Sequence, residues 1–152
     1  MPRSILVTLS LTLMAFGIVS CTSKKSEPIY YGKDSCSHCK MLIVDKRFGA
    51  EIVTAKGKIF KFDSIECMHH FEVTENEKLG SHFAEYLANT EKQGELMLAE
   101  DAYICEDPTV HSPMGKGYLT ADSKEKIKIV FAKNDKACPV FRWNELTNKL
   151  GK

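Results

Sequence analysis

The sequence predicts an α+β fold in which two similar ββαβ units follow a signal peptide and a short tether. One observation is the alternation of apolar and polar residues over 48–55 and 58–62, interrupted by Lys56 and Gly57, which is typical of a β-hairpin. The other is an internal repeat, because residues 117–125 match residues 58–66 in apolar alternation, in an Asp-Ser pair and in a glutamate at the same offset. Both copies indicate a strand, a cap and a helix, so we place the two units at roughly 31–105 and 106–152.

The first predicted helix follows the hairpin directly. Asp63 is the expected N-cap, and Glu66 three residues later completes the pattern of a capping box. Gly80 ends the helical pattern. The residues at near-helical spacing between these signals are Ile65, Met68, His69 and Phe71.

The rest of the chain predicts three further helices and several strands. Residues 82–90 favour a second helix, with Phe83, Tyr86 and Leu87 on one face. Residues 96–105 are expected to form strands on either side of a polar kink. After the second Asp-Ser pair we expect a helix, then a strand at 140–143 and a short terminal helix. The apolar residues of the last two helices are Ile127, Val130, Phe131, Leu146 and Leu150.

The first twenty residues have the pattern of an export signal. Arg3 precedes an apolar stretch over residues 5–19, which is shorter than the ~20 residues needed to span a bilayer. The stretch ends at Cys21 in a sequence that resembles the lipobox of bacterial lipoproteins, in which cleavage precedes a lipid-modified cysteine. We therefore expect residues 1–20 to be removed, Cys21 to carry the lipid, and residues 21–30 to form a polar, lipidated tether.

Composition and charge exclude some classes of protein. The chain of 152 residues has 21 basic and 20 acidic side chains, a formal net charge of +1, and 43% hydrophobic residues. A nucleic-acid-binding protein normally shows a clustered basic excess, which is absent from this composition. The high apolar fraction and low net charge also disfavour disorder.

The number of cysteines indicates that they do not all serve as structural disulfides. Once Cys21 is assigned to the lipid, an odd number remains, so at least one thiol must be free, metal-bound or paired with another chain. A disulfide between Cys105 and Cys138 and the burial of two separate thiols are both open. The remaining cysteines are Cys36, Cys39, Cys67, Cys105 and Cys138.

Sulfur and imidazole side chains gather in two short segments. Residues 36–41 read Cys-Ser-His-Cys-Lys-Met, and residues 111–115 read His-Ser-Pro-Met-Gly. Cysteine and methionine together select Cu(I), whereas zinc takes thiolate and imidazole but seldom a thioether. We therefore interpret the two segments as loops that hold Cu(I). The alternatives that need no metal are a Cys36–Cys39 disulfide, burial of Met41 in the core, and His38 and His111 as solvated surface residues.

Two other functions fit parts of the pattern. Cys36 and Cys39 could combine with Cys67 and His70, which share a helix face at i and i+3, to form a closed structural zinc site. The same two cysteines could instead serve a thiol-disulfide oxidoreductase. Against the oxidoreductase, the residues after Cys39 are more typical of a strand than of a helix.

The order of the motifs resembles the NosL family, lipoproteins that accompany nitrous-oxide reductase as copper chaperones. The resemblance covers about residues 31–146 and includes Cys21, residues 36–41, Ile43, Asp45, residues 48–51, Phe62, Asp63, Glu66, Cys67 and residues 112–115. Lys40 stands where many members have glycine.

The resemblance implies two ββαβ units and a bound Cu(I). It also implies Cys39, Met41 and Met114 as first ligands and Cys36 as the next. We accordingly expect a non-enzymatic chaperone anchored by lipid to the outer or cytoplasmic membrane on the periplasmic side. Its expected partners are nitrous-oxide reductase or the maturation machinery of a copper enzyme, and not nucleic acid.

Overall fold

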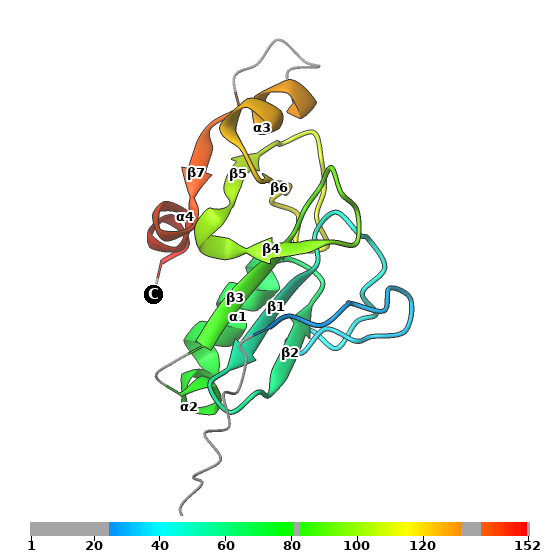
Figure 1. The fold of residues 1–152 in the computed structure, drawn as a ribbon, viewed down its shortest axis with the longest axis vertical. Helices are drawn as coiled ribbons and strands as arrows, with labels where there is room; N and C mark the ends of the chain where they lie inside the picture. The colour runs from blue at the N-terminus through cyan, green and yellow to red at the C-terminus, as the bar shows by residue number, and fades with distance from the viewer. Residues whose placement is uncertain (1–24, 81–82, 132–137, 152) are drawn as a thin grey trace, which may run out of the picture.

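The computed structural model describes residues 25–80, 83–131 and 138–151, with side chains at 129–131 left aside. Within them the chain forms two small antiparallel sheets, each with its own helix, as the sequence predicts (Figure 1). In the view of Figure 1 the second sheet and α3 lie above the first sheet and α1. No helix in these residues is long and apolar enough to cross a membrane.

The first sheet has the strand order β2-β1-β3-β4. Strands β1 (Ala50–Thr54) and β2 (Ile59–Phe62) form the predicted hairpin, with Ala50 opposite Phe62 and Val53 opposite Ile59. Every residue of β1 is buried, because β1 has a strand on each side and α1 packs against it. Strand β2 lies at an edge of the sheet, which leaves its outer side available to another segment.

The prediction of a helix at residues 82–90 is wrong. Strand β3 (Phe83–Ala88) occupies this stretch and pairs with β1 on one side and with β4 (Leu96–Leu98) on the other. The spacing of Phe83, Tyr86 and Leu87 fits a helix face, but aromatic residues also favour strands. Pairing with β1 and β4 satisfies the backbone groups of β3 on both sides, and this tertiary contact decides the conformation.

Helix α1 (Ile65–Thr74) begins one residue later than the predicted cap implies. Ser64, not Asp63, is the N-cap, and its hydroxyl accepts a hydrogen bond from the Cys67 backbone N–H at 3.2 Å. Short helix α2 (Asn76–Leu79) follows and ends at Gly80, as expected. Because Ser64 caps the helix, the Asp63 side chain is free for another role.

The second unit repeats this order with β5 (Tyr103–Glu106), β6 (Tyr118–Ala121), α3 (Lys124–Phe131) and β7 (Val140–Arg142). Its sheet has the order β6-β5-β7, and the 3-10 helix η1 (Ala99–Asp101) forms the expected kink before it. The expected boundary near residue 105 falls inside β5. The predicted closing strand ends at Arg142, because Trp143 already begins α4 (Trp143–Leu150).

Apolar contacts and a disulfide hold the two units together and close the second one. Ile104, Trp143 and Leu146 from the second unit share one core cluster with residues of the first sheet and α1. Cys105 and Cys138 form a disulfide, which settles the alternative that the sequence leaves open. Ile127 is fully buried beside this disulfide, whereas the side chains of Val130 and Phe131 lie outside the described residues.

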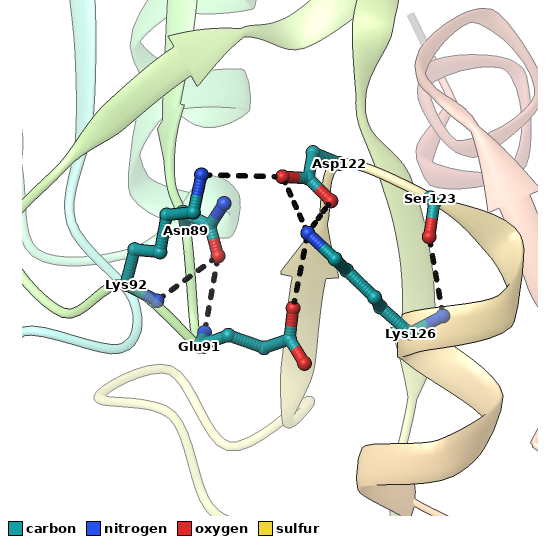
Figure 2. Close-up of polar contacts among 6 residues, drawn as sticks. All are labelled: Asn89, Glu91, Lys92, Asp122, Ser123 and Lys126. Atoms are coloured by element: carbon teal, nitrogen blue, oxygen red, sulfur yellow. Dashed lines mark hydrogen bonds and ion pairs between the residues drawn. The ribbon is translucent and has the colours of Figure 1, made fainter.

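Polar contacts also join the segment after β3 to the start of α3 (Figure 2). The Asp122 carboxylate forms ion pairs with Lys126 Nζ at 2.6 Å and with Lys92 Nζ at 3.5 Å. A Glu91 carboxylate oxygen also lies 3.8 Å from Lys126 Nζ. Ser123 accepts a hydrogen bond from the Lys126 backbone N–H at 3.2 Å, as Ser64 does from Cys67. The serine of the repeated Asp-Ser pair therefore accepts the same capping hydrogen bond in both units.

Candidate metal site

The segment containing Cys36 and Cys39 folds into a tight hairpin. The Cys36 N–H donates to the Met41 carbonyl at 2.8 Å, and the Lys40 N–H donates to the Cys36 carbonyl at 3.1 Å. Lys40 closes the turn with a φ of +69°, the one positive φ of a non-glycine residue in the described part of the chain. Glycine would adopt this conformation without strain, whereas a lysine at this position is strained.

The hairpin packs along the free edge of β2. The Ser37 N–H donates to the Lys61 carbonyl at 2.7 Å, and the Ser37 hydroxyl accepts from the Lys61 N–H at 3.2 Å. Asp63 follows Lys61 by two residues and precedes α1. The docking of one hairpin on an edge strand therefore brings Cys36 and Cys39 to the first turn of α1.

Four ligand atoms meet at this junction. The thiol sulfurs of Cys36, Cys39 and Cys67 and a carboxylate oxygen of Asp63 all lie within 4.8 Å of one another. All three cysteines are free; Cys36 and Cys67 are fully buried, while Cys39 is partly exposed. The Cys39 thiol donates to Asp63 Oδ2 at 3.2 Å, and the buried Asp63 Oδ1 has no hydrogen-bond partner. Such a group of converging acceptors is suited to a cation.

The pKa shifts of the three thiols also favour the binding of a cation. A hydrogen bond from the Cys67 thiol, helped by backbone N–H groups of Asp63, Cys39 and His38, lowers the pKa of Cys36 to about 6. Burial, together with Asp63 and Cys36, raises the pKa of Cys39 to about 11. Donation to Cys36 and burial raise the pKa of Cys67. Cys36 is thus the thiol that ionises most readily, and a metal ion bound here would displace the thiol protons that remain.

The two methionines expected as ligands lie at the surface. Met41 is 56% exposed and Met114 is 43% exposed, so neither is a core residue. Met41 belongs to the hairpin itself. The Met114 loop is held against the first turn of α1, because the Ser112 hydroxyl donates to Glu66 Oε1 and the Lys116 N–H donates to the same oxygen at 3.2 Å. Both remain predicted ligands on segments attached to the cluster.

The histidines near the site take other positions. The rings of His38 and His70 stack with centroids 5.6 Å apart and planes inclined by 13°. Among the described residues, the group of mutually close ligand atoms contains no histidine. His111 is exposed on the Met114 loop. The expected alternative in which His70 completes a zinc site with Cys67 is therefore replaced by one in which Asp63 is the fourth ligand.

Sequence reasoning selected Cys36 and Cys39 but missed Asp63 and gave Cys67 only a secondary role. A signal was present in the internal repeat. Cys67 aligns with Lys126 at the same helix position, and Asp63 aligns with Asp122, which pairs with that lysine. The first unit therefore has the Cys67 thiol and the Asp63 carboxylate, which accepts from the Cys39 thiol, where the second unit has an ordinary ion pair.

A comparison with solved structures identifies a similar fold. The copper chaperone NosL from Shewanella denitrificans superposes with a TM-score of 0.64 at 16% sequence identity, covering 81% of this chain and 96% of that chain. No protein-family model and no curated protein matches the chain. The chain thus has a NosL-like fold, as the order of its motifs predicts.

Proposed function

We propose that the protein is a non-enzymatic metallochaperone that holds Cu(I) at Cys36, Cys39 and Cys67 and passes the ion to another protein. The observation that carries the proposal is the convergence of three free thiols on one point within 4.8 Å. Thiolate sulfur is the ligand that Cu(I) prefers. The NosL-like fold supports copper as the ion, since the structurally similar protein is a copper chaperone.

Transfer requires that an incoming ligand reach the ion. Cys36 and Cys67 lie at the buried end of the cluster, while Cys39 is partly exposed. Met41 and Met114 add exposed thioethers on the two segments that border the site. We infer that Cys36 and Cys67 retain Cu(I). Cys39 and the two methionines form the labile side, from which a recipient withdraws the ion by ligand exchange.

The remaining parts of the proposal concern location and partner. Cys21 would carry the lipid and confine the chaperone to the outer or cytoplasmic membrane, on the periplasmic side. The recipient would be a copper enzyme or its maturation machinery, with nitrous-oxide reductase as the first candidate. A formal net charge of +1 suits a protein partner better than nucleic acid.

A titration of the reduced full chain with Cu(I) against a competing chelator tests the proposal. We expect one ion per chain and an affinity reduced about tenfold or more by Cys39→Ser or Cys67→Ser. Met114→Ala and Met41→Ala should weaken binding or speed release to the chelator. Val44→Ala is the matched control, because Val44 is 65% exposed and offers no donor atom. Equal affinity in wild type and Cys67→Ser would contradict the proposal.

A structural zinc site is the second candidate, and the Asp63 carboxylate favours it. Three thiolates and one carboxylate satisfy the tetrahedral preference of zinc without an open position. Such a protein would be isolated with zinc, would unfold when a chelator removes it, and would depend on Asp63 as much as on Cys67. The chaperone instead predicts that Asp63→Asn retains Cu(I) binding.

The geometry gives less support to a thiol-disulfide oxidoreductase. Cys36, the cysteine with the lowered pKa, is fully buried and cannot reach a substrate disulfide. The Cys-x-x-Cys segment also lies in a hairpin rather than at a helix N-terminus. An oxidoreductase would lose dithiol activity with Cys36→Ser and would be indifferent to Met114→Ala.

A further inference from the structure

Free thiols and a disulfide occur in the same chain. Cys105 and Cys138 are joined, whereas Cys36, Cys39 and Cys67 are all free. Disulfides form and persist where oxidants are present. A chain that carries one therefore meets conditions in which the thiols of the metal site can react as well.

Access singles out Cys39 as the sulfur that an oxidant meets first. Cys36 and Cys67 have no exposed surface, while Cys39 is partly exposed. Thiol–disulfide exchange begins when a thiol sulfur attacks one sulfur of a disulfide, so the attacking atom must be within reach of that reagent. Accessibility thus decides the order of reaction here, although the buried Cys36 is the thiol that ionises more readily.

Cys36 lies in position to complete the reaction. Its sulfur is within 4.8 Å of the Cys39 sulfur, and both residues belong to one turn, which the Lys40 N–H closes on the Cys36 carbonyl at 3.1 Å. A bond between two sulfurs needs them about 2.0 Å apart. Rotation of two side chains on one turn can supply that movement, whereas a bond from Cys67 to either cysteine would join the hairpin to α1.

We propose that Cys39 is a site of reversible modification by small disulfides, with Cys36 as the resolving cysteine. In the first step the Cys39 sulfur attacks the reagent RSSR, forms a mixed disulfide and releases one RSH, which takes the thiol proton. In the second step the Cys36 sulfur attacks the Cys39 sulfur of the mixed disulfide, forms the Cys36–Cys39 disulfide and releases the second RSH. The two cysteines lose two electrons and two protons, which the reagent gains. An excess of thiol reverses both steps.

The consequence for the metal rests on the proposed function. A Cys36–Cys39 disulfide removes two of the three thiols from the site and leaves Cys67 with Asp63. The metal ligand is the thiolate, and a disulfide sulfur carries no such charge. Oxidation would therefore close the Cu(I) site, and a bound Cu(I) would in turn protect both sulfurs from exchange.

The test exposes the metal-free full chain, with its thiols reduced, to oxidised glutathione. The products are alkylated, digested and mapped by mass spectrometry, which scores Cys21 and the disulfide of the second unit separately. We expect wild type to form the Cys36–Cys39 disulfide and Cys36→Ser to stop at a glutathione adduct on Cys39. An adduct confined to Cys39, with Cys67 unmodified, shows that this variant keeps its fold.

The matched control is Cys67→Ser, because it removes a thiol of the same cluster and should still form the Cys36–Cys39 disulfide. The proposal is overturned if Cys36→Ser gives no adduct on Cys39, if Cys67→Ser accumulates that adduct, or if wild type forms a disulfide from Cys67 instead.

A Cu(I) titration of the oxidised chain separates this proposal from the proposed function. We expect binding to be weakened by about a hundredfold or more, because the loss of two ligands should exceed the cost of about 10–100-fold that follows an outer-shell change. Reduction should restore it. Equal binding by the oxidised and reduced chains would overturn the closure of the site. A reduced chain that binds no Cu(I) but still forms the disulfide would contradict the proposed function while the exchange chemistry stands.

Discussion

Replacing Glu51 should change how the stability of the protein depends on pH. Glu51 lies in β1 with no exposed surface; its Oε1 accepts the Glu27 N–H at 3.0 Å, and its Oε2 has no hydrogen-bond partner. Lys61 lies opposite on β2, but its ammonium is bonded to Asp34 at 2.8 Å. Burial is thus the main reason why the pKa of Glu51 is raised from 4.5 to about 7.

The sign and size of the effect follow from linkage. Because folding raises the pKa of this acid, the folded state binds the proton more tightly than the unfolded chain does. The stabilisation is complete below about pH 4.5 and is lost as pH rises through about 7. A shift from 4.5 to about 7 corresponds to about 3 kcal/mol in the free energy of unfolding. Glu51→Gln cannot ionise and should therefore be more stable than wild type by up to about 3 kcal/mol above pH 8, and similar to it near pH 4.

Chemical denaturation of the metal-free protein between pH 4 and pH 9 measures this difference. Glu77→Gln, which changes an exposed glutamate, should run parallel to wild type throughout. The reasoning is refuted if the difference between Glu51→Gln and wild type is constant over this range, or if wild type gains stability relative to the variant as pH rises.

Two further changes concern the segments that border the cysteines. Lys40→Gly should stabilise the protein by about 0.5–1 kcal/mol, because glycine adopts a φ of +69° without strain; denaturant unfolding measures it, and a loss of stability would contradict the explanation of that turn. Ser112→Ala should cost about 1–3 kcal/mol, because it leaves the buried Glu66 carboxylate without its hydroxyl donor. If Met114 binds copper, Ser112→Ala should also speed Cu(I) release in the chelator titration, whereas unchanged release would remove Met114 from the site.

Local patterns were sufficient for much of the fold. The hairpin of β1 and β2, the helix after it and the repeated Asp-Ser cap all depend on residues close together in the sequence. The assignment at residues 82–90 failed because a spacing of three and four residues is compatible with both a helix face and a half-buried strand. Only the vacant edge of β1 distinguishes them, and no local pattern reports it.

Part of the candidate metal site could likewise be predicted from local sequence, and part could not. The sequence by itself determined that Cys36 and Cys39 form a compact pair of soft donors, three residues apart in the chain. Only the tertiary structure decided that Cys67 and Asp63 join them, because that meeting depends on the hairpin docking on β2 through Ser37. Residues within one turn are constrained by backbone geometry, whereas residues 24 or more positions apart meet only through the packing of whole elements.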